Sequence, residues 1–262
     1  LPTQSIDWSG PSQMSLNVTT VQLAITELSY HPADPNVAES QVDALFSASD
    51  FEFIELQNIG SGPIQLEGYA FTNGVDLTLP NAVLEAGQYG VVVSDRRAFE
   101  ARYGTEKNVL GQYSGKLKNS GERVALADAE GNTLFDFEYG DDDPWPVRAD
   151  GSGATLELID PAGTPAGQYG QYYRWRGSTE QGGSPGAAGV GQLGDLDLDG
   201  DVDFDDIGDL VLALTDADAY QARYGVSELV SGDLDRNGAV DQVDIDMFVA
   251  LLRAADKRAL RS

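Results

Sequence analysis

The sequence contains no cysteine and a single histidine among its 262 residues. Without cysteine the chain forms neither a disulfide scaffold nor a thiolate metal site. This absence does not place the protein inside the cell, because a secreted protein without cysteines can be stabilised by another device, such as a bound metal. Any stabilising metal would be held without sulfur ligands.

Long apolar runs are also missing. No segment approaches the roughly 18 consecutive apolar residues that a membrane-spanning helix needs, so we expect no transmembrane segment. The chain starts at Leu1 without a methionine and without the basic and apolar stretches of a signal peptide. We therefore expect a mature form or a fragment of a longer protein.

Basic residues are scarce. There are 16 Lys and Arg against 43 Asp and Glu, which gives a formal net charge of −27. The imbalance is concentrated between Asp195 and Asp246, where 16 acidic residues accompany two arginines. An acidic surface repels nucleic acid and anionic lipid, so neither is an expected partner. Acidic residues at regular spacing within one segment instead indicate bound cations.

Composition divides the chain into four parts. Residues 1–20 are polar and form a leader or the end of an upstream domain. Residues 21–181 carry short strand-like runs separated by turn residues, which predicts an antiparallel sandwich or barrel. Residues 182–193 are rich in Gly, Pro and Ala and predict a linker, and residues 194–262 contain the acidic segment.

Local signals in the strand-rich part predict two hairpins and one helix. Asn73-Gly74 favours a type I′ turn between two strands, and a second hairpin is expected around Glu130-Gly131-Asn132. A short helix is expected over 95–104, with Asp95 as its N-cap and Gly104 at its end.

Two twelve-residue segments, 38 residues apart, repeat one pattern: DLDLDGDVDFDD (195–206) and DLDRNGAVDQVD (233–244). Both have oxygen-bearing side chains at loop positions 1, 3, 5, 9 and 12 and Gly at position 6. This is the EF-hand spacing, in which these side chains and the carbonyl of position 7 converge on one Ca²⁺ ion. We expect Val202 and Val240, at position 8, to pair the loops as a short antiparallel bridge.

Each loop is followed by apolar residues at i, i+3, i+4 and i+7. They are Ile207, Leu210, Val211 and Leu214 after the first loop, and Ile245, Phe248, Val249 and Leu252 after the second. We expect two amphipathic helices whose apolar faces pack together. A solvated acidic segment would not repeat both features, and a thrombospondin-type calcium repeat lacks the helices. Carboxylate crowding should couple calcium binding to folding.

The Asp at position 12 of each loop, the single helix after it and the tandem arrangement resemble a type I dockerin over about 194–252. The resemblance implies two Ca²⁺ ions and anchoring to a cohesin-like protein or a cell-surface component. Millimolar extracellular calcium fills weak sites, which indicates an extracellular or cell-surface location. The implied ligands are Asp195, Asp197, Asp199, Asp201 (carbonyl), Asp203 and Asp206, then Asp233, Asp235, Asn237, Ala239 (carbonyl), Asp241 and Asp244. At positions 10 and 11, where cellulosomal dockerins often carry a Ser-Thr-like pair, this chain has Phe204-Asp205 and Gln242-Val243.

The strand-rich part resembles the bacterial lamin-tail domain. The similar segments are ITELSYHPAD (25–34), DFEFIELQNIG (50–60), LEAGQYGVVVSD (84–95) and YSGKLKNSGERVALADAEGN (113–132). This resemblance implies an immunoglobulin-like sandwich over about 21–140, with an extension to 181, that acts in adhesion or positioning. The expected fold class is mainly β, an immunoglobulin-like antiparallel sandwich, with a small all-α, EF-hand-like C-terminal calcium module.

No set of side chains indicates catalysis, so we expect no catalytic residue and no enzyme. Glu52 and Glu55 are three residues apart and point to opposite faces of a strand, which favours turn hydrogen bonds or edge protection. A turn role is expected for His31 and a solvated loop for 141–143. Residues 174–176 could line a carbohydrate or anion site, although packing of Trp175 at the sandwich edge is favoured.

The sequence thus predicts a noncatalytic secreted or cell-surface segment for adhesion or anchoring. The alternative is an accessory C-terminal region of a secreted hydrolase, acting on polysaccharide or phosphoester, with its catalytic domain upstream. A carbohydrate-binding module would show a row of exposed aromatic residues on the sandwich, and Trp8, Trp145 and Trp175 form no obvious row in the sequence.

Overall fold

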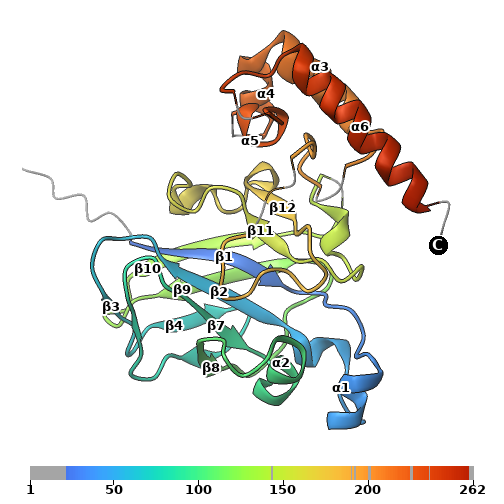
Figure 1. The fold of residues 1–262 in the computed structure, drawn as a ribbon. Coiled ribbons are helices and arrows are strands. Elements are labelled where there is room, and N and C mark those ends of the chain that lie inside the picture. Colours follow the sequence, from blue (N-terminus) through green and yellow to red (C-terminus); the bar gives the residue numbers. More distant parts are fainter. Residues whose placement is uncertain are drawn as a thin grey trace, which may run out of the picture.

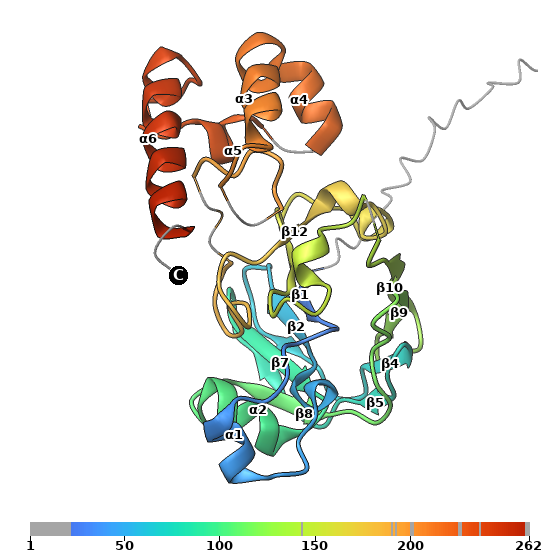
Figure 2. The ribbon, with the colours of Figure 1, turned by 90° about the vertical axis from the view of Figure 1, so that its right-hand side faces the viewer.

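A β-rich part and a helical C-terminal part make up the computed structural model (Figure 1). The structure describes residues 22–142, 144–189, 191, 193–199, 202–224, 227–235 and 237–259. The expected leader at 1–20 and the expected carbonyl ligand Asp201 lie outside these residues. A view turned by 90° shows the helical part beyond the β12 end of the sandwich (Figure 2).

Two main sheets form the sandwich. The larger sheet has six strands in the order β12-β11-β1-β2-β7-β8. Its strands are β1 (Leu23–Ser29), β2 (Phe53–Asn58), β7 (Tyr89–Val93), β8 (Val109–Gln112), β11 (Leu156–Leu158) and β12 (Trp175–Gly177). The second sheet contains β4 (Ala70–Asn73), β5 (Leu77–Thr78), β9 (Glu122–Ala127) and β10 (Thr133–Tyr139), and β3 (Ile64–Gln65) pairs with β6 (Val83–Leu84). The expected mainly β sandwich is confirmed.

The core lies between the sheets and is rich in aromatic residues at one end. Ile54 and Leu56 on β2 are fully buried there, as strand alternation predicts. Trp175 stacks on Phe137 with ring centroids 5.9 Å apart, and its Nε1 donates to the carbonyl of Tyr169 at 2.7 Å. The expected packing of Trp175 against the edge of the sandwich is therefore observed, because β12 is the outermost strand of its sheet.

The two predicted hairpins and the predicted helix are present. Strand β4 pairs with β5 and β9 with β10. The turn after Asn73 is longer than the expected type I′ turn, because residues 74–76 connect the strands and only Gly74 has positive φ. The extra length lets Val75 reach the core, where it is 4% exposed.

Helix α2 (Arg96–Tyr103) begins after Asp95, whose Oδ1 accepts from the Ala98 N–H at 2.9 Å, and ends at Gly104. The helix corrects one expectation: the sandwich is not wholly antiparallel, because β8 runs parallel to β7. A parallel pair needs a crossover between its strands, and α2 provides it. Its Phe99 packs on Phe53, on the sheet face opposite the core.

Short helical turns complete the sandwich. They are α1 (Val37–Val42) and the 3₁₀ turns η1 (Ala48–Phe51), η2 (Val147–Ala149), η3 (Ala166–Gln168) and η4 (Tyr172–Arg174). Helix α1 has a capping box, in which Asn36 accepts from the Glu39 N–H while the Glu39 carboxylate accepts from the Asn36 N–H.

The C-terminal part contains α3 (Asp206–Thr215), α4 (Ala217–Tyr224), α5 (Leu229–Gly232) and α6 (Gln242–Ala259). Helices α3 and α6 are the two expected amphipathic helices. Their apolar faces are only partly buried: Leu210, Phe248 and Leu252 lie in the core, whereas Ile207, Val211 and Val249 are 42%, 53% and 36% exposed. In the described part of the chain no helix is long and apolar enough to span a membrane.

The reason for this partial burial is helix α4, which was not predicted from the sequence. Its Tyr220 and Tyr224 fill the core together with Leu196 and Leu234 from the two loops. The expected bridge between Val202 and Val240 is not among the β-bridges of the described residues. Each valine instead packs beside the glycine before its own loop, Gly194 or Gly232.

The predicted linker is in contact with the sandwich. Residues 183–189 cross the outer face of the six-stranded sheet, and the Ser184 N–H donates to Glu27 Oε1 at 3.1 Å. The Tyr103 hydroxyl on α2 donates to the Gly182 carbonyl at 2.9 Å, at the start of this segment. We call residues 182–189 the strap.

Candidate metal centre

The first acidic loop brings three predicted ligands together. Oxygen atoms of Asp195, Asp197 and Asp199 lie within 4.8 Å of one another. Asp195 is 1% exposed. Leu198, between Asp197 and Asp199, has a φ of 63° and is buried in the helical core, so the backbone folds sharply while its side chain points away from the acidic groups. These carboxylates face one point because the loop coils around it.

The last residue of each loop organises its backbone in the same way in both copies. Asp206 Oδ1 accepts from the Leu196 N–H at 2.6 Å, and its Oδ2 accepts from the Asp203 N–H at 2.8 Å. Asp244 makes the matching bonds to the N–H groups of Leu234, at 2.7 Å, and Asp241, at 2.8 Å. Every partner is shifted by the same 38 residues, so the repeat seen in the sequence is also a repeat of hydrogen bonds.

Several of the other predicted ligands lie in two further groups, whereas Asp241 belongs to neither. Asp233, Asp235 and Asp244 form one within 4.8 Å, and Asp203, Asp205 and Asp206 form the other. Asp205 was not predicted, because position 11 supplies no ligand in the EF-hand pattern. In the second loop Asn237 donates from Nδ2 to Asp235 Oδ2 at 3.0 Å, and Asp241 Oδ2 lies 3.5 Å from the same Nδ2.

Burial and crowding raise the pKa values of the first loop. Burial, followed by the charges of Asp206, Asp199 and Asp197, raises the pKa of Asp195 to about 9. Burial also raises the pKa of Asp197 to about 7 and that of Asp206 to about 6. A carboxylate with such neighbours is stabilised by a cation. The donors are all oxygen atoms, which suit a hard divalent cation such as Ca²⁺.

The two loops differ in their surroundings. The first loop lies against the sandwich, where a Cβ atom on Gly177 of β12 would meet the Asp199 carbonyl oxygen at 2.3 Å. On its other side the Tyr220 hydroxyl of α4 donates to the Leu196 carbonyl at 2.7 Å. In the second loop Asp235 and Asn237 are exposed or near the surface. The first loop is therefore the more enclosed of the two.

Residues 18–141 match the family model of the lamin tail domain. The fold and the acidic loops thus define a β-sandwich protein with a helical, carboxylate-rich C-terminal part, and the match supports a lamin tail domain in the sandwich. Strands β11 and β12 follow the matched segment and complete its six-stranded sheet beside β1. No curated protein matches the chain.

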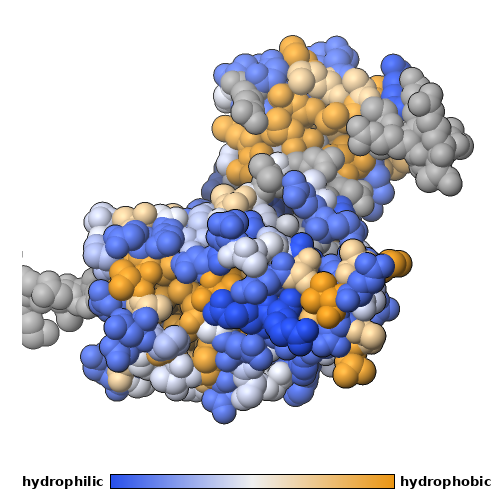
Figure 3. All heavy atoms as spheres, turned by 60° about the horizontal axis from the view of Figure 1, so that its bottom comes forward, coloured by the Kyte–Doolittle hydropathy of each residue, from blue (hydrophilic) through white to orange (hydrophobic). Residues whose placement is uncertain are grey.

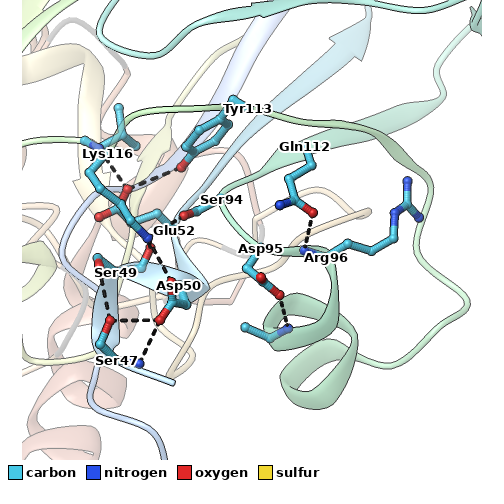
Figure 4. Close-up of polar contacts among 12 residues, drawn as sticks. Ser47, Ser49, Asp50, Glu52, Ser94, Asp95, Arg96, Gln112, Tyr113 and Lys116 are labelled. Atoms are coloured by element: carbon cyan, nitrogen blue, oxygen red, sulfur yellow. Dashed lines mark hydrogen bonds and ion pairs between the residues drawn. The ribbon is translucent and has the colours of Figure 1, made fainter. Parts of the chain in front are cut away.

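A second acidic feature is Glu52, at the entrance to β2 (Figure 4). Its Oε2 accepts from the Leu117 N–H at 2.8 Å and lies 3.4 Å from the Tyr113 hydroxyl, whereas its buried Oε1 has no hydrogen-bond partner. Lys116 reaches Ser94 and Asp50 beside it. Burial, opposed by the Leu117 N–H and by Lys116, raises the pKa of Glu52 to about 7.

Glu55 faces the other side of the sheet, as predicted, but β2 is an interior strand, so edge protection is not its role. It belongs to a row of buried carboxylates that cross-strand pairing brings together: Glu55 is opposite Glu27, and Glu27 is opposite Glu157. Neither Glu27 nor Glu157 was predicted to belong to a site, although an acidic residue inside the apolar run 21–30 is a signal in the sequence.

The strap binds this row. The Ser184 hydroxyl donates to Glu157 Oε1 at 3.0 Å, and the Gly186 N–H donates to Glu55. Arg176 Nη2 lies 3.1 Å from Glu157 Oε2. Burial raises the pKa of Glu55 to about 7 and that of Glu27 well above its usual range. All three carboxyl groups therefore have structural partners, which favours a role in fixing the strap rather than in acid–base chemistry.

His31 lies where a turn role was predicted. Its Nδ1 is 2.6 Å from Asp150 Oδ1, which ties the end of β1 to the loop before β11. Asp143, in the predicted solvated loop, lies outside the described residues.

Proposed function

We propose that the protein is a noncatalytic segment in which a lamin-tail sandwich is joined to a calcium-stabilised, dockerin-like docking module. The observation that carries this proposal is the repeated hydrogen-bond scheme of the two loops, centred on Asp206 and Asp244. In each loop three carboxylate groups lie within reach of one point, at loop positions 1, 3 and 5 in the first loop and at positions 1, 3 and 12 in the second. The repeated backbone scheme supports two ions of the same kind.

Calcium is the ion that the donors favour. The ligand oxygens come from carboxylates, an amide and backbone carbonyls, which Ca²⁺ binds with six to eight ligands in flexible geometry. The carboxylates of Asp195 and Asp233, at the first position of each loop, are buried, so cation binding would relieve repulsion that otherwise opposes folding. We infer a location outside the cell or on its surface, where millimolar calcium is present.

Docking is the role that the rest of the module supports. Ile207, Val211 and Val249 leave an exposed apolar surface on the two helices that follow the calcium loops. Such a surface is typical of a contact with another protein. We propose a cohesin-like protein or a cell-surface component as the partner, with the sandwich acting in adhesion or spacing.

Calorimetric titration of the EDTA-treated protein with Ca²⁺ tests the proposal. We expect two equivalents to bind, and calcium at about 100 times Kd to raise the free energy of unfolding by about 2.7 kcal/mol per coupled site. Asp195→Ala and Asp233→Ala should each remove one equivalent. Asp218→Ala is the matched control, because Asp218 is an exposed acidic residue of α4 outside both loops. Parent protein that binds no calcium at millimolar concentration would refute the calcium module.

A further inference from the structure

A cleft separates the sandwich from the helical part beside the first acidic loop. Its volume is about 330 Å³, within the range of about 300–1,000 Å³ that is common for small-ligand sites. One wall comes from the sandwich, with Trp145 and the η4 residues Tyr172 and Tyr173. The other wall comes from the helical part, with Asp199, Asp205 and Arg223. Neither part alone forms the cleft.

The sandwich wall is aromatic and accessible. Tyr172 is 39% exposed and Trp145 is half-buried. The rings of Tyr172 and Tyr173 are 5.5 Å apart and meet edge to face at 82°, so they form an angled surface rather than one flat stack. Aromatic side chains of this kind offer an apolar face together with a polar edge. The structure thus gathers aromatic residues that are 27 and 28 positions away from Trp145 in the sequence.

The helical wall is polar. Arg223 is held in place, since its Nη1 is 2.9 Å from Asp209 Oδ1 and its guanidinium lies 5.1 Å from the centre of the Tyr224 ring. Asp197 and Asp199 also line the cleft, and they belong to the first loop, where a bound cation would offset their charge. Asp205 and Arg223 remain as an acceptor and a donor, and the charge of Arg223 is already paired with Asp209. An anionic ligand would therefore face carboxylates and is not favoured.

We propose that this cleft binds a neutral saccharide. A sugar ring has an apolar C–H face, which suits Trp145 and Tyr172, and hydroxyl groups at its rim, which suit Asp205 and Arg223. A purely apolar ligand would bury these two charged groups without hydrogen bonds, which is costly. Saccharide binding goes beyond the proposed docking role. It rests on the proposed function at one point, which is that the first loop holds a cation.

Titration of the calcium-loaded protein with cellotetraose, xylotetraose, mannotetraose and chitotetraose tests the inference, with tryptophan fluorescence and calorimetry as readouts. We expect one molecule of at least one of these tetrasaccharides to bind per chain. Trp145→Ala and Tyr172→Ala should each weaken its binding at least tenfold. Leu45→Ala is the control, since Leu45 is an 88% exposed apolar residue of the sandwich outside the cleft lining and outside both acidic loops.

Calcium content and thermal unfolding of every variant are measured in parallel. Two bound calcium ions with no binding of any of the four tetrasaccharides would overturn the saccharide inference and leave the docking proposal intact. Binding that Tyr172→Ala leaves unchanged would also overturn it, because this exposed side chain can be removed without opening the core. Saccharide binding that Tyr172→Ala abolishes would support the inference even in a protein whose loops bind no calcium.

Discussion

Glu52 is a buried carboxylate at the start of a central strand. One carboxylate oxygen accepts hydrogen bonds from the Leu117 N–H and the Tyr113 hydroxyl, and the other has no hydrogen-bond partner (Figure 4). Its pKa of about 7 in the folded protein exceeds the usual value of 4.5, mainly because of burial. The folded state therefore binds a proton more tightly than the unfolded chain. The contribution of this group to stability is complete below about pH 4.5 and is lost as the pH rises through 7.

Glu52→Gln should raise the free energy of unfolding by about 1–2 kcal/mol at pH 8 and leave it nearly unchanged at pH 4.5. The amide keeps an oxygen for the Leu117 N–H, and its NH₂ group takes the place of the unpartnered oxygen. Urea unfolding at the two pH values provides the measurement, with the exposed Glu85→Gln as the control. A loss of stability at pH 8 would show that the folded state prefers the charged form.

At the scale of elements, β1 and the strap explain why the sheet buries three carboxyl groups. The pairing register of β1 shifts between Ile25 and Glu27, which is the mark of a β-bulge. Ile25 and Leu28 lie in the core, while Thr26 and Glu27 bond to groups outside it: Thr26 Oγ1 donates to Glu55 at 2.7 Å. The bulge thus places two successive polar residues under the strap, where their partners lie.

Gly183→Ala should lower the free energy of unfolding by about 2–4 kcal/mol, a large value that follows from steric overlap in a closed contact. An added Cβ would lie 1.7 Å from Glu27 Oε1 and 2.4 Å from Thr155 Oγ1. Gly87→Ala is a close control, because Gly87 has nearly the same φ, 76° against 75°, but no atom within 4 Å of an added Cβ. It should cost only the 1–2 kcal/mol of a left-handed backbone.

Urea unfolding of the two variants separates backbone strain from packing. Equal losses of stability would mean that the strap does not rest on the sheet, and a larger loss for Gly183→Ala would place it there.

At the scale of the whole molecule, the sandwich and the helical part share a contact. Ile159 of the sandwich packs on the core of the helical part. Gly177 of β12 faces the Asp199 carbonyl so closely that a side chain there would push the first acidic loop away. Arg176, the residue before it, is buried and paired with Glu157. The face of the sandwich seen in Figure 3 carries apolar residues among polar ones.

Gly177→Ala should uncouple the two parts. We expect one thermal transition for the calcium-loaded parent, and two for the variant, because the loop loses its support. The helical part should unfold about 4–8 °C lower for each kcal/mol of lost contact. Differential scanning calorimetry measures this, with Gly167→Ala as the control, since nothing lies within 4 Å of a Cβ atom there. Two transitions in the parent would show that the contact is too weak to couple the parts.

Periodicity and turn chemistry were enough for the elements whose signals are local. The hairpins, α2 with its caps, and helices α3 and α6 all follow signals that act within a few residues, so local preference and structure agree. Helix α4 was missed, because its burial depends on Tyr220 and Tyr224 entering a core that other segments create. The parallel β7–β8 pair and the longer turn after Asn73 depend on tertiary packing in the same way.

The acidic loops show most clearly which features the sequence determines and which depend on the tertiary structure. The sequence alone determined the spacing of their carboxylates and the helices that follow. A coiled loop brings carboxylates at such fixed spacing toward one another. Only the tertiary structure decided that Glu27, Glu55 and Glu157 form one row, and that Trp145 and Tyr172 line the same cleft as Arg223. These groups come from distant parts of the chain, and strand register and the contact between the two parts bring them together, which no local pattern encodes.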